Sequence, residues 1–217
     1  NFVVLEHMKA VIAFELFLSK DFACGSLKLR FDLFSFSILD SHAPFAESEV
    51  SYVECPELYS GTRPTVFLAG GISNCPNWQV LMKDLVSSMC PGLIPSNPRR
   101  KNFDVTASNM HEEQIKWEFD ALRAAAVIIF WFPKDTLCPI TLYELGTWSV
   151  LHRTHGCDII VGTDPEYGRA ADVKTQLSLI TGRDFPVYHT LEDLAKALQT
   201  WWHDHKENLK RTYQPTL

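Results

Sequence analysis

The sequence predicts a doubly wound α/β protein with a central sheet of five parallel strands. From residue 65 onward, short runs of β-branched and other apolar residues alternate with segments whose apolar residues recur at helical spacing. The connections between these segments are short, and the run AVIIFWF at residues 126–132 is apolar on both faces, as a central strand would be. Repeated strand–helix units of this kind form parallel sheets with helices packed on both faces.

The expected elements follow one another along the main domain. Strands are expected at residues 65–69, 92–97, 126–132, 157–162 and 185–189, and helices at residues 77–90, 112–125, from 141 onward, 173–182 and 190–202. Gly182 is placed to end the fourth helix, and Thr190 to cap the fifth. The apolar residues that recur at helical spacing are Trp78, Leu81, Leu85 and Met89 in the first helix, and Ile115, Phe119 and Leu122 in the second.

We expect three regions: an N-terminal appendage at residues 1–61, the α/β domain at residues 62–205 and a C-terminal tail at residues 206–217. Within the appendage, apolar and polar residues alternate from residue 26 to residue 33, which predicts a half-buried strand. A helix-like stretch precedes this strand, and a polar, acidic loop follows it. The appendage is expected to add a strand and a helix to the sheet edge or to a partner chain.

The composition narrows the classes of function. The chain has 217 residues, 46% of them hydrophobic, and a net charge of −6, so it lacks the basic surface that nucleic-acid binding needs. No run approaches the ~20 apolar residues of a membrane span. The six cysteines are scattered without a C-x-x-C pair, which predicts free thiols in a reducing cytoplasm rather than zinc or disulfides. No metal or other cofactor is expected.

The stretch PITLYELGTW, residues 139–148, allows two interpretations of Glu144. Thr141 and Glu144 have the S/T-x-x-E spacing of a capping box, in which the Glu side chain bonds the backbone N–H of the capping residue. A carboxylate near a helix N-terminus is also held ionised by the helix dipole, which suits an active group at the ligand end of the sheet. Glu144 is therefore expected to be a cap, a nucleophile, or both.

Glu118 is the second candidate carboxylate, on the preceding helix beside Gln114 and Trp117 and on a different stripe from the apolar residues. Paired carboxylates that flank a glycosidic bond are the usual equipment for glycosyl chemistry, where one attacks the anomeric carbon and the other positions or protonates. The alternative is that each carboxylate is a solvated surface charge, the common situation for a Glu on a helix.

The loops at the carboxyl ends of the strands hold further candidates, because ligands bind at that edge of a doubly wound sheet. Gly70 and Gly71 would let the backbone approach a ligand, or would make a tight turn into the helix that begins near Trp78, itself a candidate substrate contact. Arg99 and Arg100 would hold a 5′-phosphate, or would form a solvated basic loop. The chain has no G-x-S-x-G, Walker or G-x-G-x-x-G sequence.

Three segments, TVFLAGGIS (65–73), QIKWEFDALRAAAVIIFWFPKD (114–135) and TLYELGTWS (141–149), together resemble the nucleoside 2-deoxyribosyltransferase family. The likeness covers roughly residues 65–202. It implies a flavodoxin-like fold in a homodimer or higher homo-oligomer, with Glu144 as the nucleophile that takes the deoxyribosyl group. It also implies that Glu118 is the partner acid, with Asp120 as a fallback, and that Phe67 approaches the base.

Several positions depart from the family pattern. Phe67 stands where Tyr is common, and Glu118 where Asp is usual. Asp135 is the nearest acid to the position of a base-contacting Asp, which would fall near Cys138. Asp172 stands where the resemblance implies an Asn that reaches into a neighbouring subunit's site.

The expected function is transfer or hydrolysis of the N-glycosidic bond of a 2′-deoxynucleoside or its 5′-monophosphate through a glycosyl–Glu144 intermediate. The expected partner is thus a small nucleoside or nucleotide, with no nucleic acid and no membrane. The alternative is a catalytically inactive nucleotide-binding or interaction module on the same scaffold, which the changed positions favour. Base exchange would indicate a transferase, release of free base a hydrolase, and binding without turnover a module.

Overall fold

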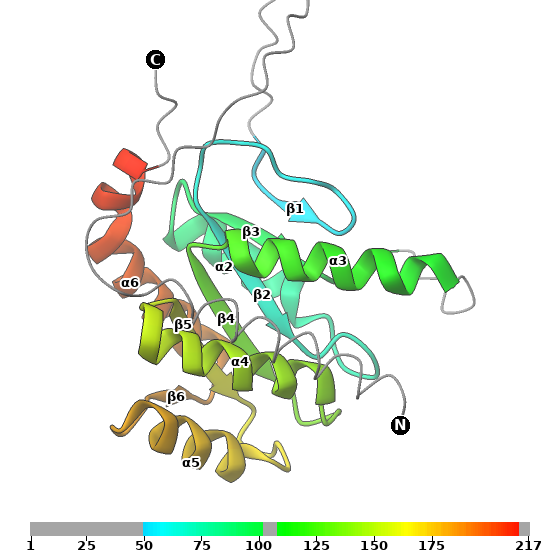
Figure 1. Cartoon of the computed structure of the whole chain (residues 1–217), viewed down its shortest axis with the longest axis vertical. Helices are drawn as coiled ribbons and strands as arrows, with labels where there is room; N and C mark the ends of the chain where they lie inside the picture. Colours follow the sequence, from blue (N-terminus) through cyan, green and yellow to red (C-terminus); the bar gives the residue numbers. More distant parts are fainter. Residues whose placement is uncertain (1–49, 102–107, 213–217) are drawn as a thin grey trace, which may run out of the picture. The chain divides into compact units, whose positions relative to one another are not determined.

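A computed structural model describes residues 50–101 and 108–212 of the chain. Most of the predicted N-terminal appendage, including the strand expected at residues 26–33, lies outside this range, as do the last residues of the predicted tail. The described part contains six strands and five helices, which are labelled in Figure 1.

The six strands form one parallel sheet in the order β1-β3-β2-β4-β5-β6. The two middle strands, β2 and β4, are buried at every residue, as their apolar sequences predict. The doubly wound parallel sheet is thus confirmed, with one strand more than expected, because two residues of the predicted polar loop pair with β3 at the sheet edge. The strands are Val53–Glu54 (β1), Thr65–Gly70 (β2), Ile94–Asn97 (β3), Val127–Phe132 (β4), Asp158–Thr163 (β5) and Val187–Tyr188 (β6).

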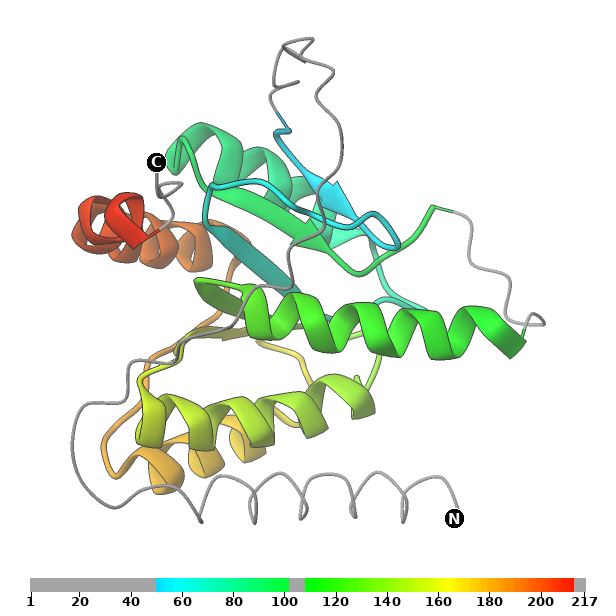
Figure 2. The same cartoon turned by 45° about the horizontal axis from the view of Figure 1, so that its top comes forward.

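Helices cover both faces of the sheet (Figure 2). Three of them, α3, α4 and α5, contribute side chains to the core on one face, while α2 and α6 contribute to the core on the other. This division is the doubly wound arrangement that the alternating elements predict. The helices are Trp78–Met89 (α2), Ser108–Ala124 (α3), Pro139–His155 (α4), Ala170–Thr181 (α5) and Leu191–Thr212 (α6).

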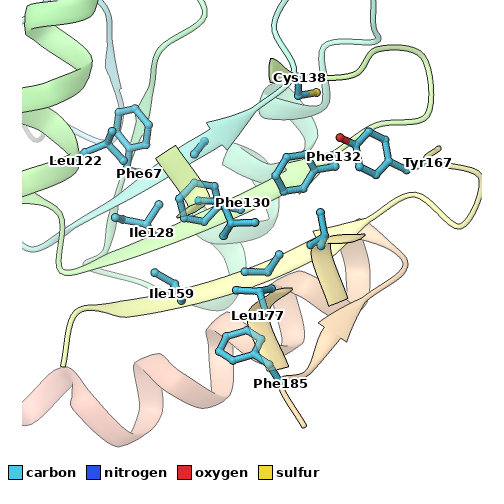
Figure 3. Close-up of a cluster of buried hydrophobic side chains, with 14 of the residues drawn as sticks. Phe67, Leu122, Ile128, Phe130, Phe132, Cys138, Ile159, Tyr167, Leu177 and Phe185 are labelled. Carbon is cyan, nitrogen blue, oxygen red and sulfur yellow. The ribbon is translucent and has the colours of Figure 1, made fainter. Parts of the chain in front are cut away.

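The core on the α3–α5 face also fixes the beginning of α4 (Figure 3). Phe132, at the end of β4, lies with its ring 5.3 Å from the ring of Tyr167. The Tyr167 hydroxyl in turn donates a hydrogen bond of 2.8 Å to the backbone oxygen of Leu137. Because Leu137 immediately precedes the N-cap residue Cys138, this contact anchors the connection that carries the chain from β4 into α4.

Only some of the apolar residues that recur at helical spacing in α2 face the core. Leu81 is 45% exposed, and the buried residues are Trp78, Gln79, Met82 and Val86. The rotation of the helix is set at its first turn, where the indole nitrogen of Trp78 and the amide nitrogen of Gln79 both donate to the backbone oxygen of Gly71, at 2.9 and 3.2 Å. These two bonds turn Leu81 outward.

In α3 the predicted apolar face is turned to solvent. Leu122 is buried, but Ile115 and Phe119 are 48% and 54% exposed. The inward stripe instead carries Gln114 and Glu118, which are hydrogen-bonded to each other. Buried polar groups are tolerated where they are paired, and here that pairing decides which stripe faces the sheet.

The predicted ends of the last two helices are confirmed. Gly182 ends α5 in the left-handed conformation, with a φ of 69°, and Thr190 Oγ1 accepts a hydrogen bond of 3.0 Å from the N–H of Asp193 at the start of α6. α6 continues to Thr212, into the segment predicted as a tail. Among the helices described, none has the length and apolar character needed to cross a bilayer.

Candidate active site

Glu144 lies in the second turn of α4 rather than at its N-terminus. The helix begins at Pro139, after an N-cap residue, Cys138, with a left-handed φ of 48°. Proline suits the first helical position because it has no N–H to leave unpaired. Thr141 is therefore a buried residue within the first turn, and no side chain caps the helix. The predicted capping box is wrong, and Glu144 is not a cap.

The surroundings of the Glu144 carboxyl group favour its neutral, protonated form. Burial raises the pKa of Glu144 to about 8, and the negative charge of Glu118 adds to this rise. Among the described residues, no hydrogen bond or cation counters the rise. The expectation that the helix dipole keeps Glu144 ionised is wrong, because the dipole weakens beyond the first turn and desolvation dominates.

Glu118 comes from α3 and is close enough to Glu144 for its charge to raise the Glu144 pKa. Burial also raises the pKa of Glu118, but a hydrogen bond from Gln114 and the positive charge of Arg100 oppose that rise. Both glutamates keep part of their surface accessible to solvent. The structure thus brings together the two carboxylates selected from the sequence and makes them a partly buried pair rather than two separate solvated charges.

Arg100 is enclosed by protein, and its positive charge acts on Glu118. Its side chain is 5% exposed, and its Nη1 lies 2.9 Å from a carboxylate oxygen of Glu113. Its Nε donates to Gln114 Oε1 at 2.6 Å and contacts the sulfur of Cys55 at 3.2 Å. Arg100 is therefore not part of a solvated basic loop.

Arg99 points to the loop that follows β2. Its Nη2 donates to the backbone oxygens of Ile72 and Cys75, the second at 3.2 Å. This arginine therefore joins the loops at the ends of β2 and β3. The two guanidinium groups bond to different parts of the protein, and their predicted role in holding a 5′-phosphate stays a prediction.

Gly70, Gly71 and Trp78 are explained by packing within the protein. A Cβ added to Gly70 would lie 2.4 Å from the backbone oxygen of Trp131, and one added to Gly71 would lie 2.8 Å from Pro133 Cγ. Trp78 is buried and bonded to Gly71, as described above. The two glycines were expected to let a ligand come close to the backbone. In the structure they let β2 pack closely against β4 and α2.

Phe67 is buried beneath α3, with its ring centroid 6.1 Å from that of Trp117. The other acids proposed as site residues lie apart from the pair. Asp120 and Asp135 are exposed, and Asp172 is an exposed residue of the first turn of α5, where it pairs with Arg169 at 3.3 Å. Within the described chain, these three carboxylates are not brought to Glu144.

Two hollows in the described surface, of about 470 and 610 Å³, lie along β6 and α6. Both include Tyr188 and Ala197, and neither includes Glu118 or Glu144. The site is therefore defined by its chemistry rather than by these hollows. The described residues also hold no group of three or more His, Cys, Asp or Glu side chains arranged to bind a metal ion.

Gln114 is the residue of the site that the sequence reading noted only as a neighbour. It accepts a hydrogen bond from Arg100 and donates one of 2.7 Å to Glu118 Oε1. The available signal was spacing, because residues four apart on a helix lie on the same face. Arg100 gives no comparable signal, since its inward direction depends on how β3 leads into α3.

The fold and the site together define an α/β protein with a partly buried pair of carboxylates supplied by α3 and α4. Residues 63–163 match the model of the family described as nucleoside 2-deoxyribosyltransferase like. That range runs from β2 to the end of β5 and includes both Glu118 and Glu144. The resemblance noted in the sequence is confirmed for this part of the chain. No curated protein matches the chain.

Proposed function

We propose that the protein transfers or hydrolyses the N-glycosidic bond of a 2′-deoxynucleoside, or of its 5′-monophosphate, through a covalent glycosyl–Glu144 intermediate. The observation that carries the proposal is the buried Glu118–Glu144 pair, supplied by two different helices within the range that matches the family. Two neighbouring carboxyl groups, one of which shifts the ionisation of the other, are the groups that a double displacement at an anomeric carbon requires.

When the pair holds one proton, one carboxyl group acts as the nucleophile and the other as the acid. In the first step the single proton passes from Glu144 to Glu118, and the Glu144 oxygen freed in this way attacks C1′ while the C1′–N bond breaks and its electrons leave with the base. Glu118 gives its proton to the departing base. The products are a glycosyl ester on Glu144 and a Glu118 carboxylate.

The second step returns the pair to its starting state. Water or a second base attacks C1′ from the side on which the first base left, and Glu118 takes the proton that the acceptor loses. The bond between C1′ and the Glu144 oxygen breaks, and its electrons return to the carboxylate. A 2′-deoxy sugar suits both steps, because no electronegative 2′-hydroxyl opposes the developing positive charge on the ring.

Two assays test this proposal. The protein would be incubated with deoxyinosine and free adenine, and separately with deoxynucleoside monophosphates. Base exchange identifies a transferase, and release of free base without an acceptor identifies a hydrolase. A 2-fluoro-sugar nucleoside should then add its sugar mass to the peptide that contains Glu144. Turnover without such an adduct, or an adduct on another residue, would rule out the proposed intermediate.

A homo-oligomer is part of the proposal, and the exposed apolar residues of α3, of α4 and of the connection that leads into α4 support it. On the side of the sheet that carries the acidic pair, five large apolar side chains are between 46% and 66% exposed: Ile115, Phe119, Leu137, Ile140 and Tyr143. Exposed apolar groups of this kind favour association with a second copy of the chain.

Changing Phe119 to glutamate should weaken the oligomer, because it places a charge where apolar surface would be buried. Dissociation is expected to become easier by about tenfold or more, the usual cost of losing a central aromatic contact. The measurement is molar mass by light scattering over a dilution series. Leu179→Glu is the matched control, since Leu179 is 70% exposed on α5, outside the α3 and α4 surfaces. A monomeric wild-type protein would contradict the proposal.

We also propose a reducing, cytoplasmic setting, which the state of the thiols supports. The five cysteines within the described residues are free. Burial raises the pKa of Cys55 and Cys90 to about 11 and that of Cys138 to about 12, so these thiols stay protonated at neutral pH. Protonated, buried thiols are inert, which is typical of structural cysteines.

A further inference from the structure

We propose that Arg100 and Gln114 are positioning residues that hold the Glu118 carboxylate in place and make it the charged member of the acidic pair in the empty site, leaving the proton on Glu144. The inference rests on the proposed function for its catalytic meaning, but its physical content concerns only side chains of this protein. Three hydrogen-bonded groups, one from the connection after β3 and two from successive turns of α3, carry it.

The hydrogen bonds run in one direction, from Arg100 to Glu118. Arg100 Nε donates to Gln114 Oε1 at 2.6 Å, and Gln114 Nε2 donates to Glu118 Oε1 at 2.7 Å. The same amide nitrogen lies 2.7 Å from the backbone oxygen of Pro98. A guanidinium can only donate, and a carbonyl can only accept, so the Gln114 amide has one orientation that satisfies all of its neighbours. That orientation presents an N–H to Glu118.

Arg100 supplies a positive charge that water hardly screens. Its side chain is 5% exposed, and its partner Glu113 is 57% exposed, so solvent weakens the negative charge of Glu113 more than the positive charge of Arg100. One guanidinium nitrogen, Nη2, is buried and has no hydrogen-bond partner within the described residues. The guanidinium is therefore incompletely neutralised, and Glu118 is a carboxylate within range of its field.

The two carboxyl groups differ in the charges and hydrogen-bond donors that surround them. Glu118 faces Arg100, the neutral thiol of Cys55 and the donated N–H of Gln114, as well as Glu144. Glu144 faces Glu118 and has no donor or cation among the described residues. When two nearby carboxyl groups share one negative charge, that charge resides on the group with donors and a cation. It therefore resides on Glu118.

This arrangement has a direct consequence for the proposed reaction. After Glu118 protonates the departing base, it is left as an anion, and the hydrogen bond from Gln114 and the charge of Arg100 stabilise that anion. The same bonds hold its oxygen in one position on α3. Arg100 and Gln114 thus act on the sugar bond only through Glu118.

The test is a titration of the two carboxyl groups by ¹³C NMR on protein labelled at its glutamate side-chain carboxyl carbons. The Glu118 and Glu144 signals are assigned by their loss in Glu118→Gln and Glu144→Gln. In the wild-type protein Glu118 should lose its proton at lower pH than Glu144. In Gln114→Met, which is similar in size but cannot donate, the Glu118 midpoint should rise by about 1 pH unit. The Glu144 midpoint should fall as it takes up part of the charge.

Arg100→Lys serves as the second variant, because it keeps the charge but loses the planar group that reaches Gln114. The matched control is Lys116→Gln, which removes an exposed cation from the same helix, where Lys116 pairs with Glu112 at 2.6 Å. This control should leave both midpoints unchanged. Wild-type titration in the reverse order would overturn the inference even if neither variant folds, and so would midpoints in Gln114→Met and Arg100→Lys that match the wild type.

The titration requires no substrate, so its outcome is separate from that of the proposed function. Absence of turnover and of a sugar adduct would refute the proposed chemistry while a shifted Glu118 midpoint would still support the positioning roles. If turnover is found, the Gln114→Met enzyme should also show a pH profile displaced in the same direction as Glu118. A loss of activity with an undisplaced profile would indicate a merely structural role.

Discussion

Replacing Glu144 with glutamine should make the fold more stable at pH 8 and remove turnover. The pKa of Glu144 is raised from 4.5 to about 8 by burial and by Glu118. Between these two values the unfolded chain loses the Glu144 proton while the folded protein keeps it. The folded state therefore binds more protons, and stability falls as the pH rises from about 4.5 to about 8.

The size of this effect follows from the shift. One pKa unit corresponds to about 1.4 kcal/mol, so the buried carboxyl group costs up to about 4 kcal/mol at pH 8 relative to a site that does not titrate. Glutamine does not titrate. The difference in unfolding free energy between Glu144→Gln and the wild type should therefore shift in favour of the variant as the pH rises from 5 to 8. Any effect of the amide itself on stability is the same at both pH values and does not alter this shift. Urea unfolding at both pH values measures this change.

The matched control is Glu112→Gln, which removes a fully solvated carboxylate whose pKa is lowered by Lys116. This variant should show no gain in stability between pH 5 and pH 8. A Glu144→Gln curve that runs parallel to the wild type over that range would show that Glu144 is ionised in the folded protein. It would thereby contradict the description of the site as a buried acidic pair.

The loss of turnover comes from the chemistry rather than from the fold. An amide oxygen is a poor nucleophile, so the covalent step should slow by on the order of 10³-fold or more. A variant that is more stable at pH 8 and inactive would identify Glu144 as a group retained at a cost to stability. Such a cost is typical of functional sites. Unchanged turnover in Glu144→Gln would refute its role as the nucleophile.

The sheet could be predicted from the sequence because its central strands carry a strong local signal. The runs at residues 65–69 and 126–132 are apolar on both faces, and a strand buried on both faces requires helices above and below it. The edge strand β1 could not be predicted in this way. It has only two residues, and its pairing with β3 depends on where the rest of the sheet lies.

Helix orientation was less predictable, because spacing identifies stripes but does not say which stripe faces inward. In α3 the apolar stripe of Ile115 and Phe119 is outward, and the polar stripe of Gln114 and Glu118 is inward. The polar stripe is tolerated inside because Arg100, from the connection that precedes α3, pairs with it. That tertiary contact leaves no mark in the local pattern.

Glu144 was correctly placed in the helix that follows β4, but its turn within that helix and its local environment were not predicted. The T-x-x-E spacing indicated a helix beginning at Thr141, whereas the helix begins two residues earlier, at Pro139. Proline at the first helical position is itself a start signal, and giving it more weight would have moved Glu144 into the second turn. The partial burial that raises its pKa depends on α3 and could not be predicted from α4 alone.

Replacing Gly70 with alanine should destabilise the fold by about 3 kcal/mol or more, the cost of forcing extra volume into a tightly packed core. The added Cβ would lie 2.4 Å from the backbone oxygen of Trp131 and 2.5 Å from Cζ2 of Trp78. Neither group can move easily. Trp131 is paired with Gly70 in the middle of the sheet, and the indole of Trp78 is held by its bond to Gly71.

Gly146→Ala is the matched control for this prediction, because a Cβ at Gly146 would meet no heavy atom within 4 Å outside its own helix. Alanine in the exposed interior of α4 should stabilise the protein by about 0.5–1 kcal/mol. Urea unfolding of the two variants should thus shift the midpoint in opposite directions. A Gly70→Ala protein as stable as the wild type would contradict the packing role. If it were also inactive, Gly70 would instead be a glycine that admits substrate, as one interpretation of the sequence suggests.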